Sequence, residues 1–267
     1  MRRDYLILAV CSSLLACNQG LSQTAPKPFL MDARINKESD GTVTIMSSSP
    51  RPLWQALEAV KRRYGWTLDY EDPLYQKNQI VPGPGKISVL KGGTFTVHLR
   101  EPASNTAAEE QRVLNDLVTQ FNAESSIQYR VIPMSDYRYD ISPISGSALD
   151  QPIVIDGEQR SLREEVDAIL ASFTKTTGIS AVQGGLMMNA MEQTEVSLNH
   201  TGTIPMRQLL KEVLDRAPRE MSWLFTYEPN GGYFAIGIQP TQQLSTTADG
   251  KTIARTFANP HLSSANN

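Results

Sequence analysis

The stretch that decides the fold is PLWQALEAVKRRYGWTLDY at 52–70, and a similar stretch, SLREEVDAILASFTKTTGI, stands at 161–179. In both, apolar residues recur at the spacing of one helix face, and a glycine then ends the pattern before a strand-like run. Gly65 takes this place in the first stretch and Gly178 in the second. The middle of the chain is therefore written twice, and each copy is predicted to begin with a helix followed by a strand.

Each copy also contains a second helix-like stretch that leads into paired strands. In the first copy this helix is predicted from about Ala107 to Ala123, and in the second it contains Leu209 and Leu214. Both copies then read as strand, helix, strand, strand, helix, strand, strand. We therefore predict an α+β fold of two tandem small βαββαββ modules, with short mixed sheets packed against two helices each.

Composition shifts along the chain set the predicted boundaries. Small and polar residues between the copies indicate a linker, and a polar segment rich in small residues after the second copy indicates a flexible tail. The predicted parts are a signal peptide at 1–16, a flexible tether at 17–40, a first module at 41–144, a linker at 145–151, a second module at 152–239 and a flexible tail at 240–267. We expect proteases to cut in the linker, in the loop 72–93 or in the tail.

The N-terminus has the layout of an export signal. Two arginines at positions 2 and 3 precede an apolar run at 6–16, which is too short for a permanent membrane span. The letters LLAC at 14–17 resemble the lipobox of bacterial lipoproteins, which implies that Cys17 becomes the acylated first residue of the mature chain. Asn18, by analogy with bacterial sorting, then favours the outer membrane. Ordinary cleavage after Ser22 is the alternative.

Three stretches resemble the short N-terminal domains of secretins and TonB-dependent receptors. They are the helix starts Pro52-Leu53-Trp54-Gln55-Ala56-Leu57 and 204–210 (IPMRQLL), and the strand-like run Gly65-Trp66-Thr67-Leu68-Asp69-Tyr70. The resemblance covers about 42–239 if both copies are counted. It implies periplasmic modules that stand without a secretin pore region and bind an envelope protein partner, with a secretion or TonB-type assembly among the candidates.

Composition and motifs give little support to other classes of function. The net charge of −3 favours no nucleic-acid partner, and the histidines at 98, 200 and 261 have no metal-ligand spacing. The sequence PGPGK at 82–86 lacks the full phosphate-loop pattern, and no nucleophile elbow is present. Met187, Met188 and Met191 could fill an apolar gap, bind Cu(I) or form an adaptable partner surface.

The resulting hypothesis is a non-enzymatic, exported cell-envelope protein that mediates protein–protein interaction or scaffolding. It would be periplasmic, touch the outer membrane only through lipid on Cys17, and need no cofactor, metal or catalytic residue. The alternative is an envelope enzyme or small-ligand binder that uses the cleft between the two modules.

Overall fold

The computed structural model of the protein describes residues 33–135, 137–184, 189–198, 200, 202–246 and 251–257. All of them belong to one compact unit, Met31–Asn267. The fold is a mixed α+β fold, as the sequence predicts. The export signal, Cys17 and most of the tether lie outside the described residues, so the predictions about them stay predictions.

The N-terminal half, residues 33–144, begins with two strands and a helix. Its main elements are β1 (Arg34–Lys37), β2 (Thr42–Ser49), α1 (Pro52–Tyr64), β3 (Thr67–Glu71), β6 (Gly93–Arg100), α2 (Ala107–Glu124), β7 (Tyr129–Ser135) and β8 (Arg138–Pro143). The loop between β3 and β6 contains η1 (Lys77–Gln79), β4 (Ile80–Pro82), η2 (Pro84–Lys86) and β5 (Ser88–Leu90).

The C-terminal half, residues 145–257, contains a similar order of helices and strands. Its elements are β9 (Pro152–Val154), β10 (Arg160–Ser161), α3 (Leu162–Thr177), β11 (Ala181–Gln183), α4 (Asn189–Gln193), β12 (Glu195–Val196), β13 (Thr203–Pro205), α5 (Met206–Leu214), β14 (Met221–Glu228), β15 (Tyr233–Pro240), β16 (Gln242–Thr246) and β17 (Thr252–Thr256). Strands β16 and β17 pair as a hairpin inside the segment predicted as a flexible tail, and β1 lies inside the predicted tether.

Local sequence signals account for the helix ends. Gly65 ends α1 in the left-handed conformation, with φ 77°, and its N–H donates to the carbonyl of Lys61. Ser161 and Glu164 form a reciprocal capping box at the start of α3, and Gly178 ends that helix as Gly65 ends α1. Gly65 and Gly178 therefore end the two helices as predicted.

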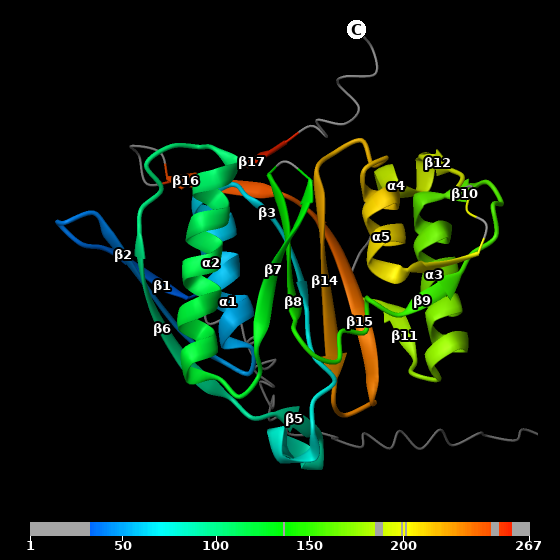
Figure 1. The fold of residues 1–267 in the computed structure, drawn as a ribbon, viewed down its shortest axis with the longest axis horizontal. Helices are drawn as coiled ribbons and strands as arrows, with labels where there is room; N and C mark the ends of the chain where they lie inside the picture. The colour runs from blue at the N-terminus through cyan, green and yellow to red at the C-terminus, as the bar shows by residue number, and fades with distance from the viewer. Residues whose placement is uncertain are drawn as a thin grey trace, which may run out of the picture. The chain divides into compact units, whose positions relative to one another are not determined.

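One six-stranded sheet runs through both halves, in the order β11-β15-β14-β3-β8-β7 (Figure 1). Strand β14 of the C-terminal half pairs in parallel with β3 of the N-terminal half, with Leu224 opposite Tyr70 and Phe225 opposite Glu71. Separate short sheets are formed by β1-β2-β6 and by β9 with β13. The sequence patterns did not predict that an edge strand of one half pairs with an edge strand of the other, so that both halves share one sheet.

The helices of the two halves cover opposite faces of this sheet. Trp223 and Phe225 belong to the apolar core of the C-terminal half, whereas Leu224, between them, packs against the core of the N-terminal half. Because successive side chains of a strand point to opposite faces, the two cores must lie on opposite sides of β14. Figure 1 shows the same arrangement, with α1 and α2 on one side and α3 and α5 on the other.

Candidate functional site

The junction between the two halves is the richest polar site among the described residues. The backbone pairing between β14 and β3 is short, and carboxylate side chains continue its hydrogen bonding on both sides. The N–H of Trp223 donates to Asp69 Oδ1 at 2.8 Å, and the N–H of Tyr227 donates to Asp72 Oδ2 at 3.0 Å. The N–H of Asp72 donates to the carbonyl of Phe225 at 2.8 Å. Acidic side chains of one half therefore satisfy backbone donors of the other.

Two arginines hold these carboxylates in place. Arg51 Nε lies 2.5 Å from Asp72 Oδ2, and Arg51 Nη2 donates to the carbonyl of Tyr227 at 2.6 Å. Arg138 Nε donates to Asp69 Oδ2 at 2.8 Å, and its guanidinium carbon lies 4.8 Å from the ring centroid of Trp223. Charge-assisted hydrogen bonds of this kind are stronger than neutral ones, so they fix the strand pairing.

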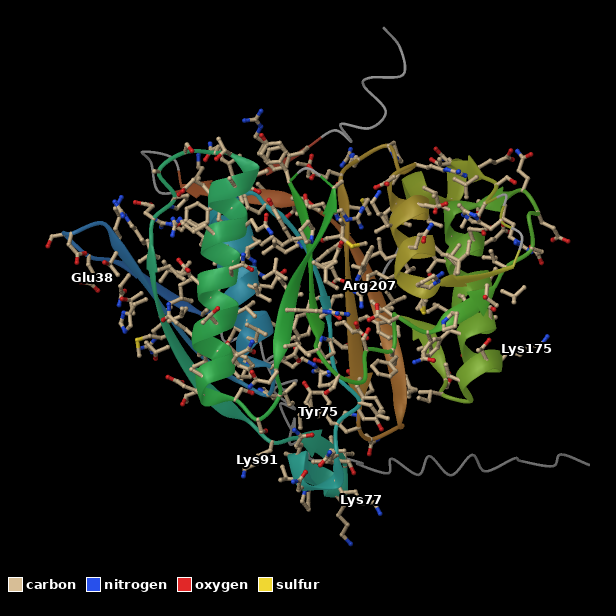
Figure 2. The ribbon with its side chains drawn as sticks, in the orientation of Figure 1. Glu38, Tyr75, Lys77, Lys91, Lys175 and Arg207 are labelled. Atoms are coloured by element: carbon tan, nitrogen blue, oxygen red, sulfur yellow. The ribbon has the colours of Figure 1, made fainter. Side chains whose placement is uncertain are left out.

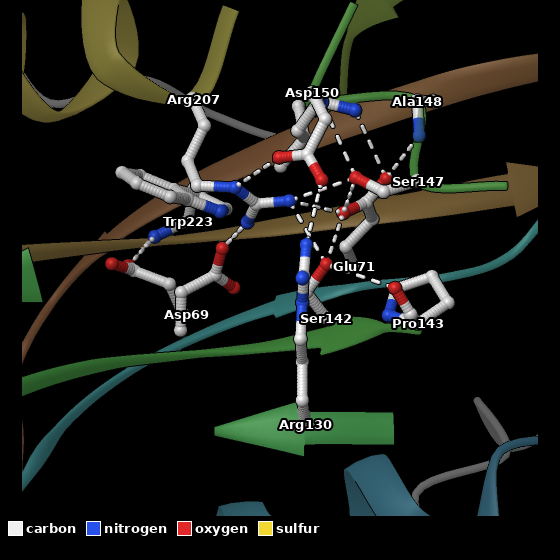
Figure 3. Close-up of polar contacts among 12 residues, drawn as sticks. Asp69, Glu71, Arg130, Ser142, Pro143, Ser147, Ala148, Asp150, Arg207 and Trp223 are labelled. Carbon is white, nitrogen blue, oxygen red and sulfur yellow. Dashed lines mark hydrogen bonds and ion pairs between the residues drawn. The ribbon is translucent and has the colours of Figure 1, made fainter. Parts of the chain in front are cut away.

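A second group of contacts surrounds Arg207 in the first turn of α5 (Figure 3). Arg207 Nη2 lies 2.8 Å from Glu71 Oε2, Arg207 Nε lies 2.9 Å from Asp150 Oδ1, and Nη1 forms an ion pair with Asp140. The side chains of Glu71 and Asp140 are 0% exposed and that of Arg207 is 7% exposed. A helix of the C-terminal half thus neutralises buried acids on two strands of the N-terminal half.

Glu71 also binds the segment that connects the halves. Its Oε2 accepts hydrogen bonds from the hydroxyls of Ser142 and Ser147 at 3.0 and 2.9 Å, and its Oε1 accepts the N–H of Leu149 at 3.0 Å. Leu149 is fully buried. The segment 145–151, predicted as a linker, is therefore anchored against β3 at Ser147 and Leu149, whereas Ser145 and Gly146 are exposed, and protease cleavage in the linker stays a prediction.

Lys61 adds a further contact across the junction. This residue of α1 is almost completely buried, and its ammonium donates to Ser222 Oγ of β14 at 2.6 Å. Burial lowers the pKa of the Lys61 ammonium, and the nearby carboxylates of Glu58 and Asp69 oppose that shift.

An open groove of about 400 Å³ lies beside this network, between β7 and the start of α5. Its lining is mostly apolar on the strand side, where Ile132, Pro133 and Met134 contribute, and Pro205 continues it next to α5. Arg130, Asp150 and Lys211 line it as well, and Arg130 forms an ion pair with Asp150 at 2.8 Å. The groove offers apolar contact area with paired charged residues beside it, the composition of a surface for a partner rather than of a reaction centre.

The backbone edge of β7 beside the groove is closed to strand pairing. The Asn122 side chain accepts the N–H of Tyr129 and donates to its carbonyl, both at 2.8 Å. The backbone groups of Tyr129, Val131 and Pro133 face away from the neighbouring strand β8. Pro133 has no N–H that could donate to an added strand. Native edge strands are commonly protected in this way against unwanted sheet extension.

The structure separates the residues that the sequence singled out. His98 Nδ1 lies 3.0 Å from the hydroxyl of Thr44, and His200 Nε2 lies 2.6 Å from Glu212 Oε2, far along the chain from each other. Met191 is buried in the core of the C-terminal half, as the gap-filling interpretation requires. Cys17, Met187, Met188 and His261 lie outside the described residues.

Sequence reasoning missed the two central residues of the junction. Glu71 directly follows the predicted strand 66–70, in which Asp69 already alternates with Leu68 and Tyr70. Polar residues on one face of a strand normally indicate that this face is exposed to solvent. Only knowledge of a buried cation opposite that face would have indicated that it is covered. Arg207 lies within the predicted helix start at 204–210, where nothing in the sequence marks it as buried.

Chemically, the network is suited to holding the halves together. The charges of Glu71, Asp140 and Arg207 are paired with one another, and no thiol or metal cluster lies among them. Within the described ranges, no three His, Cys, Asp or Glu side chains are grouped so that they could hold a metal ion. Among the described helices, none has the length and apolar character needed to cross a membrane.

Comparison with protein-family models, curated protein sequences and solved structures found no match to this chain.

Proposed function

We propose that this protein is a non-enzymatic, exported cell-envelope protein in which two tandem secretin- and TonB-type short modules mediate protein–protein interaction or scaffolding. The modules correspond to the N-terminal and C-terminal halves. The groove between β7 and α5 is the proposed contact surface.

The arrangement of strands supports the two-module interpretation. In the N-terminal half, β3 pairs in parallel with β8, and β8 pairs antiparallel with β7. In the C-terminal half, β11 pairs in parallel with β15, and β15 pairs antiparallel with β14. The pairs β2–β6 and β9–β13 are both antiparallel. A duplicated unit would produce this agreement in both strand order and direction.

The two modules pair through different edges of the same unit. The pairing strands are β14 and β3, and β14 corresponds to β7 of the first module, whereas β3 corresponds to β11 of the second. Such a head-to-tail contact could continue to further copies. Asn122 and Pro133 oppose such growth at β7, which supports a protein that remains a discrete unit and binds something other than itself there.

The observation that carries the interaction function is the open groove lined by Ile132, Pro133 and Met134 at the junction. Arg207, which also lines it, is held by Glu71 and Asp150. The space between the halves is thus occupied by paired side chains, which favours a partner on the surface over a ligand enclosed in the inter-module cleft. A mostly apolar groove with paired charged residues at its side fits an apolar segment of a partner protein.

A pull-down from envelope extracts with the wild type and two variants tests this proposal. Ile132→Glu places a carboxylate in the groove, and the matched control Thr96→Glu places one on the exposed face of β6. We expect the wild type and Thr96→Glu to retain the same partner and Ile132→Glu to lose it. Equal retention by Ile132→Glu, or hydrolytic activity without any partner, would count against the proposal.

Anchorage is a separate part of the proposal. Acylated Cys17 would attach the protein to the outer membrane, since several acyl chains give stable attachment whereas one chain binds only marginally. Cys17→Ser should release the protein into the soluble periplasmic fraction or stall processing of the precursor. Wild-type protein found already in the soluble fraction would remove the lipid anchor but not the interaction function.

A further inference from the structure

A second hollow, of about 330 Å³, lies in the N-terminal half and takes no part in the junction groove. The start of α1, strand β3, the loop 72–93, the end of α2 and the start of β7 form its walls. Figure 2 shows the loop residues Tyr75 and Lys91 at this end of the N-terminal half, with Lys77 farther out. The lining residues that matter chemically are Arg51, Tyr70, Tyr75, Lys91, Phe121 and Tyr129.

Buried aromatic side chains form one wall of this hollow. The rings of Tyr70 and Tyr129 are stacked with centroids 5.8 Å apart, and the ring of Phe121 meets that of Tyr129 edge-on at the same distance. Trp54 lies behind, 5.3 Å from Tyr70 between centroids. Aromatic pairs are favourable beyond their buried area, so a planar ring entering the hollow would extend an existing cluster.

The phenol groups of this wall stay neutral. The hydroxyls of Tyr70 and Tyr129 lie 3.0 Å apart, and Tyr75 donates to Asp72 Oδ1 at 3.0 Å. Burial, and then the charge of Asp72, raise the pKa of the Tyr75 and Tyr129 phenols well above the usual range. The phenols therefore carry no negative charge that would repel an anion.

The charged side chains that line the hollow directly are all basic. Arg51 and Lys91 line it, and none of the described residues that line it is acidic. Asp72 already pairs with Arg51, whereas exposed Lys91 has no ion pair within the described part of the chain. The first turn of α1, which forms a wall, also carries no acidic residue. These features disfavour an amine or a metal cation and favour an anion.

We propose that this hollow binds a compact aryl carboxylate, with the ring against Phe121 and the tyrosine wall and the carboxylate towards Lys91 and Arg51. The volume of the hollow, about 330 Å³, is near the lower end of about 300–1,000 Å³ for ligand sites. It therefore suits a single ring with a short acidic side chain. This site is independent of the partner groove.

Calorimetric titration with phenylacetate tests the site, with phenylacetamide as the neutral isostere and acetate as the ringless acid. We expect saturable binding of phenylacetate and binding at least about ten-fold weaker for each of the other two, since each lacks one of the two recognition features. Lys91→Glu should weaken phenylacetate binding about ten-fold, the effect of reversing one partly solvated charge near the ligand. Lys77→Glu, an exposed charge reversal in the same loop and outside the lining, should leave it unchanged.

Three results would overturn the proposal. They are no saturable binding of phenylacetate up to about 10 mM, equal affinity for phenylacetamide, and equal weakening by Lys91→Glu and Lys77→Glu. The side chains of Lys91 and Lys77 have no hydrogen bond or ion pair in the described structure, so both variants should fold, and circular dichroism would verify this before titration.

Discussion

Replacing Arg207 with methionine should strongly destabilise the protein, because it leaves buried carboxylates without their cation. The guanidinium lies 2.8 Å from Glu71 and 2.9 Å from Asp150, and it also pairs with Asp140. The side chains of Glu71 and Asp140 are 0% exposed, so water cannot replace the lost partner. Methionine keeps a long, flexible side chain, which limits the loss of packing.

The expected loss is about 3–5 kcal/mol, the usual cost of removing one partner of a buried ion pair. The whole free energy of unfolding of a protein is only about 5–15 kcal/mol, so the effect would be a large share of it.

Urea unfolding followed by tryptophan fluorescence measures this loss, since Trp54 and Trp66 report on the N-terminal half and Trp223 on the C-terminal half. Arg130→Met is the matched control. Arg130 pairs with Asp150 at 2.8 Å, but the two side chains are 46% and 42% exposed, so this pair should contribute at most about 1 kcal/mol. A loss below about 0.5 kcal/mol for Arg207→Met, or an equal loss for both variants, would refute the structural role of the network.

Three further predictions concern a buried acid, the two cores and the edge of β7. Burial, and then repulsion by Glu220, raise the pKa of the Glu110 carboxyl to about 7. Protonated Glu110 therefore stabilises the folded state below the unfolded pKa of about 4.3, and this contribution is lost as the pH rises to about 7. Glu110→Gln should therefore lessen the fall in melting temperature between about pH 4.3 and about pH 7, whereas Glu124→Gln, at an exposed position, should not. Parallel curves of melting temperature against pH for the wild type and Glu110→Gln would contradict the raised pKa of Glu110. Leu57→Asp and Leu210→Asp, both at positions 0% exposed, should each lower the free energy of unfolding by about 3 kcal/mol or more. Wild-type melting of either variant would show that its position is not in a core. The double variant Asn122→Ala, Pro133→Val should self-associate with rising concentration in analytical ultracentrifugation because it reopens the edge of β7, whereas Asn115→Ala, on an exposed site of α2, should remain like wild type. A double variant that sediments like wild type would mean that the edge is protected in another way.

Local structure could be predicted well from the sequence because short-range signals determine it. The apolar spacing of α1, its end at Gly65 and the capping of α3 by Ser161 act within a few residues, so each is visible in the sequence. The mixed α+β character follows for the same reason. The hairpin of β16 and β17 was missed because its polar strands lack the apolar alternation by which strands are identified.

The junction could not be predicted because its partners are far apart along the chain. Asp69 accepts the N–H of Trp223, and Glu71 binds Arg207, and neither contact leaves a periodic pattern in the sequence. Acidic residues on one face of β3 look solvent-exposed until the helix that covers them is known. The aromatic hollow likewise depends on Tyr70, Tyr75 and Tyr129 meeting from a strand, a loop and a second strand.

The central claim, that the groove between β7 and α5 contacts an envelope partner, is tested most directly by site-specific photo-crosslinking in cells that produce the protein. A photoreactive residue in place of Ile132 lies in the groove, and the same residue in place of Thr96 lies on the exposed face of β6. The account predicts a discrete crosslinked product of one defined mass from position 132 and none from position 96. No product from position 132, or the same product from both positions, would contradict it.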